Sequence, residues 1–301
     1  MSRIDDGVGA GVVRGDGAQE RGPFADRSIG SIIAESRNLN AEQVEQVLRY
    51  QRDHGVRFGE AAVALGLASS DDVLFALSQQ FHYPYAPGEN RVGSPELVTL
   101  NAPFGYQAES FRAIRSQLMM RVYNDERART AIAVVSPDSG DGKTFFAANI
   151  AATLAQLGGR TLLIDADMRG PRQHEVFGIE NKSGLSGILS GRSESKVIQQ
   201  VAGIPSLFVL PVGITPPNPL ELVERPAFGL LIRELIGKFD HVIVDTPAAV
   251  YGSDCAVIAA RCGAGLIIAR RNSARVDALH EMLSDLSNAT MNVVGVVIND
   301  L

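Results

Sequence analysis

Apolar positions recur with helical spacing in two successive stretches near the start of the chain. The stretch IGSIIAESRNLNAEQVEQVLRYQ can be laid over FGEAAVALGLASSDDVLFALSQQ, and each copy has the pattern of a short helix, a turn, an N-cap (Asn40, Ser70) and a longer helix. Within the first copy, Val44 and Leu48 stand four residues apart and fall on one helix face. The repeat predicts a small helical module over residues 28–85.

A different pattern begins at about Gln107, where helical and strand patterns alternate up to Leu301. The segment TAIAVVS is a short apolar run with β-branched residues, typical of a buried strand, and the Ala-rich segment FFAANIAATLAQLG is typical of a helix. Two further apolar strands are predicted within RTLLIDADMRG and FDHVIVDTP. The alternation predicts an α/β fold with a mostly parallel, doubly wound sheet and helices on both faces.

The segments on either side of the helical module have little periodic apolar content. Residues 1–27 are rich in Gly, Asp and Arg, which predicts a disordered tail. Residues 86–106 contain APGENRVGSPELVTLNAPFG, whose Pro, Gly and Asn punctuation predicts a linker. The expected organisation is therefore a tail, a helical module over 28–85, a linker, and an α/β domain over 107–301.

Composition and charge exclude several classes of function. The chain has 301 residues and a net charge of −6, so no basic field argues for nucleic-acid binding. No apolar run approaches the ~18 residues needed to span a bilayer, so we expect a cytoplasmic protein whose membrane role depends on a partner. Cys255 and Cys262 lack a metal-ligand spacing and are expected to be reduced, mostly buried thiols.

The segment SPDSGDGKTFFAAN resembles a phosphate-binding loop (P-loop) of the pattern G-x-x-x-x-G-K-S/T. Gly142, Lys143 and Thr144 keep the closing half, whereas Pro137 stands where the opening glycine belongs. A predicted strand precedes the loop and a predicted helix follows it, as a P-loop requires. Backbone N–H groups would surround the phosphates, Lys143 would reach the β- and γ-phosphates, and Thr144 would offer its hydroxyl to Mg²⁺. The predicted nucleotide-binding residues of the loop are Ser139, Gly140, Asp141, Gly142, Lys143, Thr144 and Phe145.

Three aspartates stand at the ends of the other predicted strands. Asp165 and Asp167 end the second strand, and Asp245 ends the third, in the manner of a Walker B aspartate. A strand-ending aspartate is often only a cap, but three features in this order are hard to obtain by chance. We predict Lys143, Asp165 and Asp167 as catalytic, with Asp165 as base or orienter of a hydroxyl. Thr144, Asp167 and Asp245 are the predicted metal ligands.

Residues 107–301 closely resemble the bacterial tyrosine kinase family, the P-loop proteins of capsule and exopolysaccharide synthesis. The proline-containing loop is a trait of that family, and LLIDADMRGPRQHEVFG, GLSGILSG, LPVGITPPNPLELV and GVVIND match its later segments. The resemblance implies ATP and Mg²⁺ as cofactors, phosphotransfer to protein tyrosine or to water, and a place for Asn299 near the adenine. It also implies a homo-oligomer joined through Glu109, Arg112 and Arg115 of ESFRAIR. Without the resemblance, a solvated charged face would be the preferred explanation of that stripe.

The helical module resembles the N-terminal domain of type II secretion and pilus-assembly ATPases, some of which bind cyclic di-GMP through tandem motifs. The second copy fits that motif with Arg57, Gly59 and Gln80, whereas the first has Ser28 in place of the arginine. We therefore favour a protein-docking module over a nucleotide sensor. Together, the two domains resemble the chain-length-determinant tyrosine kinase of exosortase-associated exopolysaccharide clusters. This resemblance implies a membrane-spanning chain-length partner, a polysaccharide co-polymerase, and a place peripheral to the inner membrane.

Two alternatives to a tyrosine kinase concern the reaction and the branch of the fold. Typical kinases of the family end in a tyrosine-rich tail, whereas this sequence ends at Leu301 and its nearest tyrosine is Tyr251. A regulatory ATPase that switches between ATP and ADP states on a membrane partner is thus the competing hypothesis. Partition and septum-site ATPases share the fold class, but they carry a lysine near the loop start, where this chain has Asp138.

Overall fold

The computed structural model describes residues 28–80, 93–123, 129–192, 196–289 and 291–300. The chain divides into two compact units, residues 1–69 and 70–301, each described separately below. The tail expected over 1–27 and the first part of the expected linker lie outside the described residues. The division falls within the range 28–85 that the repeat assigns to one module, so those domain bounds stay a prediction.

The described part of the first unit consists of α1 (Ile29–Ser36), α2 (Ala41–His54) and α3 (Phe58–Ala64). Asn40 caps α2 as expected: the Gln43 backbone N–H donates to Asn40 Oδ1 (2.8 Å), and the Asn40 backbone N–H donates to Gln43 Oε1 (3.0 Å). The predicted inner face is shifted, because Val47 is fully buried while Leu48 is 43% exposed. The apolar stripe of α2 therefore centres one residue before Leu48, and Val44 is half-buried.

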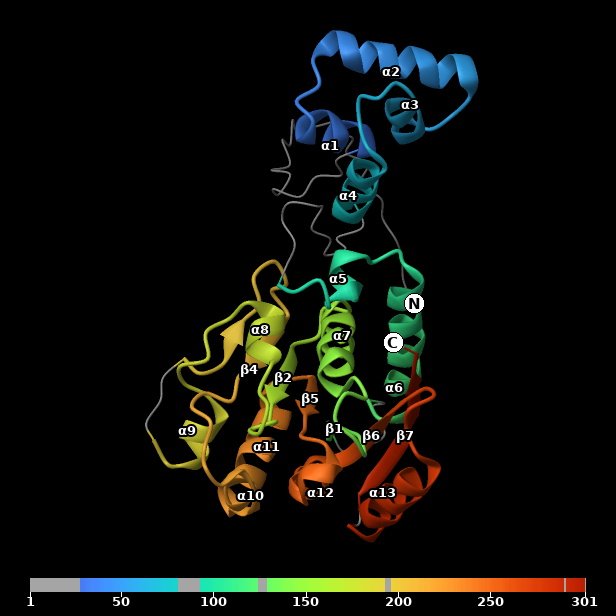
Figure 1. Ribbon diagram of the computed structural model, residues 1–301. Helices are drawn as coiled ribbons and strands as arrows, with labels where there is room; N and C mark the ends of the chain where they lie inside the picture. Colours follow the sequence, from blue (N-terminus) through green and yellow to red (C-terminus); the bar gives the residue numbers. More distant parts are fainter. Residues whose placement is uncertain (1–27, 81–92, 124–128, 193–195, 290, 301) are drawn as a thin grey trace, which may run out of the picture. The chain divides into compact units, whose positions relative to one another are not determined.

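The second unit begins with α4 (Ser70–Gln80), in which Ser70 is already helical rather than the cap that the sequence suggests. Its centre is a seven-stranded sheet of order β3-β4-β2-β5-β1-β6-β7 (Figure 1). Every pairing is parallel except that between β3 and β4, which confirms the predicted α/β fold. The strands are β1 (Ala131–Val135), β2 (Thr161–Asp165), β3 (Gln199–Gln200), β4 (Leu207–Leu210), β5 (His241–Asp245), β6 (Gly263–Arg270) and β7 (Asn292–Asn299).

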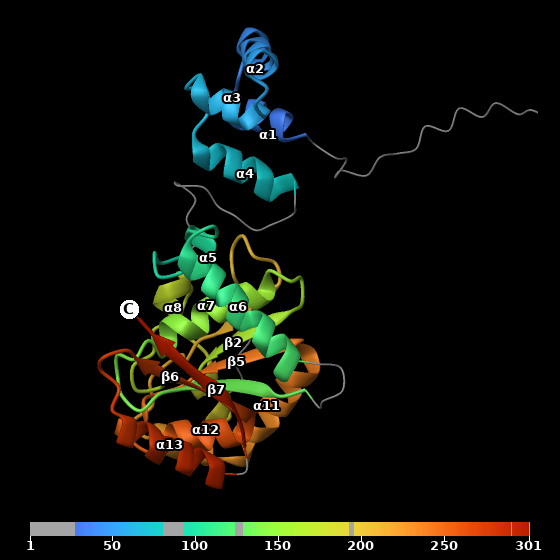
Figure 2. The ribbon, with the colours of Figure 1, turned by 90° about the vertical axis from the view of Figure 1, so that its right-hand side faces the viewer.

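Helices cover both faces of this sheet (Figure 2). One face carries α5 (Val98–Asn101), α6 (Tyr106–Arg121), α7 (Lys143–Ala155) and α8 (Gln173–Phe177). The other carries α9 (Leu185–Leu189), α10 (Pro219–Glu224), α11 (Pro226–Lys238), α12 (Asp254–Cys262) and α13 (Val276–Asn288). Alternate residues of β1 enter the two cores: Ala133 packs on the α12 side, and Ile132 and Val134 pack on the α7 side. Both faces are buried, which is why the strands read as continuous apolar runs.

The described part of the expected linker, residues 93–106, is not an extended connection. Leu97 and Leu100 are buried: Leu97 stands directly before α5, and Leu100 lies within it. Asn149, in the middle of α7, accepts hydrogen bonds at Oδ1 from the Thr99 backbone N–H and hydroxyl (both 3.0 Å) and donates to the Glu96 carbonyl (2.8 Å). We call residues 93–101 the docked segment, because these bonds fix it along α7.

None of the helices within the described ranges is long and apolar enough to cross a membrane. Cys255 and Cys262 are buried free thiols in α12, as expected. Burial raises the pKa of the Cys255 thiol to about 11 and raises the pKa of Cys262 further. Both therefore stay protonated and contribute to the core beneath β1.

Candidate functional site

The P-loop runs from Ser136, at the end of β1, to Thr144 in the first turn of α7. Ser136 donates its hydroxyl to the Asp138 carbonyl (2.7 Å), and Asp141 accepts the Asp138 backbone N–H (3.1 Å). These short-range bonds shape the loop without the usual opening glycine. Where the loop ends, α7 begins, and the N–H groups of its first turn have no partner within the helix. This is the arrangement that binds phosphate in P-loops.

Lys143 lies over this loop. Its Nζ donates to Ser136 Oγ (3.0 Å), and only 7% of the residue is exposed. A buried ammonium group needs a partner, and a hydroxyl is a weak one for a full positive charge. A phosphate oxygen would be a much stronger acceptor, so the position of Lys143 agrees with the predicted phosphate contact.

Asn299 reaches the same loop from the end of β7. Its Nδ2 donates to the Asp141 carbonyl (2.9 Å), and a Cβ placed on Gly142 would collide with that amide. Gly142 also has φ +97°, a left-handed conformation that other residues rarely adopt. The structure therefore places Asn299 against the loop backbone, and its predicted contact with adenine stays a prediction.

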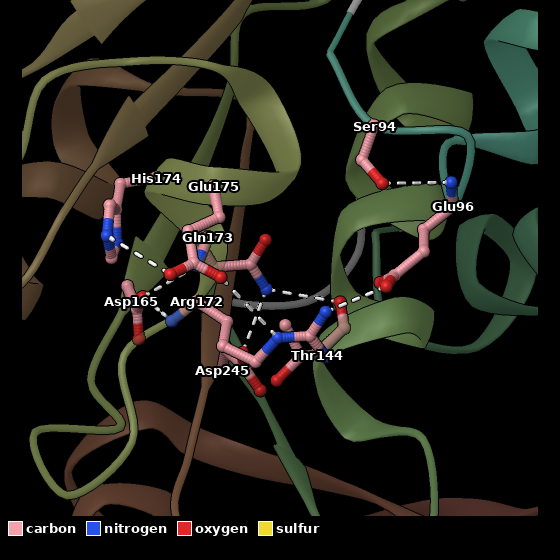
Figure 3. A network of polar contacts seen from close by, with 9 residues as sticks. All are labelled: Ser94, Glu96, Thr144, Asp165, Arg172, Gln173, His174, Glu175 and Asp245. Atoms are coloured by element: carbon pink, nitrogen blue, oxygen red, sulfur yellow. Dashed lines mark hydrogen bonds and ion pairs between the residues drawn. The ribbon is translucent and has the colours of Figure 1, made fainter.

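Asp165 and Asp245 lie side by side at the carboxyl ends of β2 and β5, where they are register partners. Both are fully buried. Asp165 Oδ2 accepts the backbone N–H groups of Arg172 (3.1 Å) and Gln173 (3.0 Å), and Asp245 Oδ2 accepts Gln173 Nε2 (2.8 Å). We call Asp165, Gln173 and Asp245 the carboxylate corner (Figure 3).

The carboxylate corner disfavours two negative charges. Burial raises the pKa of Asp165 well above its ordinary value, and the neighbouring Asp245 carboxylate raises it further. Burial also raises the pKa of Asp245 to about 6, although hydrogen bonds from Gln173 and Thr144 and the charge of Lys143 act against the rise. A cation bound beside these groups would reverse the effect, because it favours the charged carboxylates.

Asp167 lies near the corner but is only half-buried. Its Oδ1 accepts the backbone N–H groups of Arg169 (3.1 Å) and Gly170 (3.0 Å) in the turn after β2. Its charge raises the pKa of both Asp165 and Asp245, which places it within electrostatic reach of them. The structure thus gives one oxygen of Asp167 a role in shaping the turn, and its predicted catalytic and metal-binding roles stay predictions.

The residues that face the predicted Mg²⁺ have the donors that this ion prefers. Asp245 Oδ1 is buried and has no hydrogen-bond partner among the described residues, and the Thr144 side chain lies close enough to the same carboxylate to lower its pKa. Within the described part of the chain, no three His, Cys, Asp or Glu side chains form a metal cage. Mg²⁺ in P-loop sites needs no such cage, because phosphates and water complete its coordination. The donor set therefore fits.

The charged residues predicted to join subunits, Glu109, Arg112 and Arg115 of α6, make contacts within this chain. Arg112 pairs with Glu109 (2.6 Å) and also donates to the Pro103 carbonyl, while Arg115 Nη1 donates to the Thr153 carbonyl of α7 (3.0 Å). These contacts tie α6 to its neighbours. The expected role of the stripe between subunits stays a prediction.

Sequence reasoning missed two polar residues that organise the site, Gln173 and Asn149. Gln173 stands inside the quoted segment LLIDADMRGPRQHEVFG, but its contact with Asp245 crosses 72 residues. Asn149 lies in an Ala-rich helix and binds residues 50 and 53 positions earlier. An isolated Asn amid small apolar residues was the only available signal, and it did not identify the partners.

Comparison with known proteins adds independent support for this interpretation. The model of the CobQ/CobB/MinD/ParA nucleotide-binding domain family matches residues 132–301. The putative tyrosine-protein kinase CapB of Staphylococcus aureus is 34% identical over 208 residues, which is 68% of this chain and 89% of CapB. The chain belongs to the bacterial tyrosine-kinase family. The resemblance inferred from the variant loop is thereby confirmed.

Other members of the family differ in length and extend the comparison. The putative tyrosine-protein kinase EpsB of Ralstonia solanacearum is 33% identical over 205 residues, covering 68% of this chain but only 27% of EpsB. The solved kinase domain of Escherichia coli ETK superposes with a TM-score of 0.66 and 30% identity, covering 71% of this chain and 83% of that domain. The chain thus spans about a quarter of EpsB's length, and the solved fold agrees with the one described here.

Proposed function

We propose that residues 107–301 form an ATP-dependent kinase domain that transfers the γ-phosphoryl group of Mg²⁺-ATP to a protein tyrosine in exopolysaccharide synthesis. The observation that carries the proposal is the convergence of Lys143 and Thr144 from the P-loop with Asp165 and Asp245 from two neighbouring strands. Membership of the tyrosine-kinase family, through relatives such as CapB, supports the same reaction.

Each of these residues has a distinct task in the proposed reaction. The first-turn N–H groups of α7 and the Lys143 ammonium bind the phosphates and stabilise the charge that develops on them. Mg²⁺, when bound, neutralises charge on the β- and γ-phosphates. The Thr144 hydroxyl and the Asp245 carboxylate would provide oxygen ligands to Mg²⁺. Asp165, whose pKa is raised by burial, is suited to accept the proton of the incoming hydroxyl.

A purified full-length chain incubated with labelled ATP tests this proposal. Mass spectrometry for phosphotyrosine and an assay for free phosphate distinguish a kinase from a regulatory ATPase, because the latter would release phosphate alone. Lys143→Met should reduce turnover by at least about 100-fold, since a donor to the transition state is lost. The matched control is Lys238→Met, at an exposed lysine paired with Glu234 on α11. Equal turnover by wild type and Lys143→Met would reject the site.

The finer assignments extend this proposal. We propose that the helical module docks on a protein, a membrane-spanning chain-length partner, so that the chain works at the inner membrane without crossing it. Arg57, at the start of α3, stands in the copy that fits the cyclic di-GMP motif. Calorimetry of the full chain with cyclic di-GMP separates the two ideas: no heat at high ligand concentration supports the docking module, whereas saturable heat supports a nucleotide sensor.

A further inference from the structure

Gln173 is the first residue of α8 and lies fully buried between the P-loop helix and β5. Its side-chain Nε2 donates to two acceptors, the Thr144 carbonyl (3.1 Å) and Asp245 Oδ2 (2.8 Å). Its backbone N–H donates to Asp165 Oδ2 (3.0 Å). One residue therefore contacts the P-loop and both buried carboxylates, as Figure 3 shows.

Packing alone does not explain an amide at this position. Gln173 Oε1 is buried and has no hydrogen-bond partner among the described residues. An unpaired buried acceptor costs free energy that an apolar side chain of similar length, such as methionine, would not incur. What distinguishes glutamine from methionine here is the pair of hydrogen bonds that Nε2 donates. Both acceptors belong to predicted metal ligands, Thr144 and Asp245.

These bonds determine which oxygen of Asp245 stays open. Gln173 occupies Oδ2, whereas Oδ1 has no partner within the described residues. Free rotation of the Asp245 carboxylate would exchange its two oxygens, and the donor from Gln173 opposes that rotation. The same nitrogen holds the carbonyl of Thr144, whose side chain lies near Asp245. Gln173 therefore fixes the spacing between Thr144 and Asp245, two of the predicted metal ligands.

We propose that Gln173 is a positioning residue: it orients the Asp245 carboxylate and the Thr144 turn so that their oxygens face the Mg²⁺ that accompanies the nucleotide. The inference rests on the proposed function and adds to it a residue to which the sequence assigned no role. Residues that orient metal ligands through hydrogen bonds commonly contribute 10- to 100-fold to metal affinity. Gln173 should therefore affect the part of nucleotide binding that depends on Mg²⁺.

The test measures ADP affinity of the full chain by calorimetry, with and without Mg²⁺. Gln173→Met keeps the length and removes the donor, and it should reduce the Mg²⁺-dependent gain in affinity by about 10-fold or more. Affinity without Mg²⁺ should change by less than about 3-fold, because the P-loop contacts remain. The matched control is Gln200→Met, whose exposed side-chain amide donates to the Pro205 carbonyl (2.7 Å) and lies away from the site.

Each outcome decides the matter. An unchanged Mg²⁺-dependent gain in Gln173→Met overturns the proposal, and so does an equal loss of affinity with and without Mg²⁺, which would indicate a structural role. If the methionine variant does not fold, Gln173→Asn, whose amide is one methylene too short to reach Asp245, takes its place. Failure of both to fold would also assign Gln173 a structural role. Absence of ADP binding by the wild type would instead overturn the proposed function.

Discussion

The P-loop and the carboxylate corner lie at the same edge of the sheet, but they are built differently. The corner is fully buried, whereas the P-loop is exposed at Ser139 and Gly140. Several bonds that shape the P-loop join residues two to seven positions apart, such as Ser136 with Asp138 and with Lys143, although Asn299 also reaches the loop from the end of β7. The corner joins Gln173 to Asp245, 72 residues away. A local motif can be recognised from a few adjacent letters, whereas the corner exists only after β2 and β5 have paired.

The comparison would fail if the P-loop depended as strongly on remote contacts as the corner does, and Asn149→Ala tests this. The substitution removes the bonds that hold the docked segment on α7 and leaves the buried Thr99 backbone N–H and the half-buried Glu96 carbonyl unpaired. We expect a loss of about 3–5 kcal/mol in the free energy of unfolding. Denaturant unfolding measures the loss, and ADP affinity of the folded fraction should stay within about 3-fold if the loop is locally determined.

Gly142→Ala tests whether the local conformation of the P-loop is needed for nucleotide binding. Alanine at φ +97° is strained by about 1–2 kcal/mol, and its Cβ would displace Asn299 from the Asp141 carbonyl. We expect ADP affinity to fall by roughly 10- to 30-fold, because the strain distorts the loop that holds the phosphates. Gly237→Ala is the control, since a Cβ there meets no atom. Equal ADP affinity of the two variants would contradict the assignment of the loop.

The raised pKa values of the two aspartates in the carboxylate corner should make the free energy of unfolding depend on pH. Burial raises the pKa of Asp245 to about 6 and that of Asp165 above its ordinary value. The folded chain therefore binds these protons more tightly than the unfolded chain, in which a carboxyl group titrates near about 4. The stabilisation is complete below about pH 4 and is lost as the pH rises through about 6.

Thermal unfolding of the nucleotide-free chain between pH 4 and 7, compared with Asp245→Asn, measures this effect. The wild type should lose more stability than the variant across that interval, because the variant cannot ionise at position 245. Parallel curves for the two proteins would show that the corner does not hold its protons as proposed. Mg²⁺ with ADP should reduce the difference, since bound cation favours the charged carboxylates.

The smallest expected effect on stability comes from removing the exposed ion pair of Arg172, whose backbone N–H bonds Asp165. Arg172 and Glu96 form an ion pair (2.7 Å) whose side chains are 49% and 38% exposed, and such pairs contribute about 0–1 kcal/mol. Arg172→Ala should therefore change the free energy of unfolding no more than Arg271→Ala, which removes an exposed pair with Asp300. A loss above about 2 kcal/mol for Arg172→Ala alone would mean that the corner is held by its ion pair rather than by Gln173.

The structure departs from the sequence pattern in two places, the docked segment and the inner face of α2. The docked segment was expected to be linker, because Pro, Gly and Asn surround it, yet Leu97 and Leu100 are buried against the sheet domain. Likewise, Leu48 was expected on the inner face of α2, but Val47 is the buried residue. In both cases the outcome depended on the surface that the segment packs against, which a periodic pattern does not specify.

By itself, the sequence determined the α/β fold, the P-loop with Lys143 and Thr144, and the aspartates that end β2 and β5, because each depends on local spacing and on runs of apolar residues. Only the tertiary structure decided that Gln173 holds Asp245, that Asn149 fixes the docked segment, and that Asn299 reaches the loop. Those contacts join residues 53 to 158 positions apart. The order of the strands in the sheet brings them together, and no single segment of the chain encodes that order.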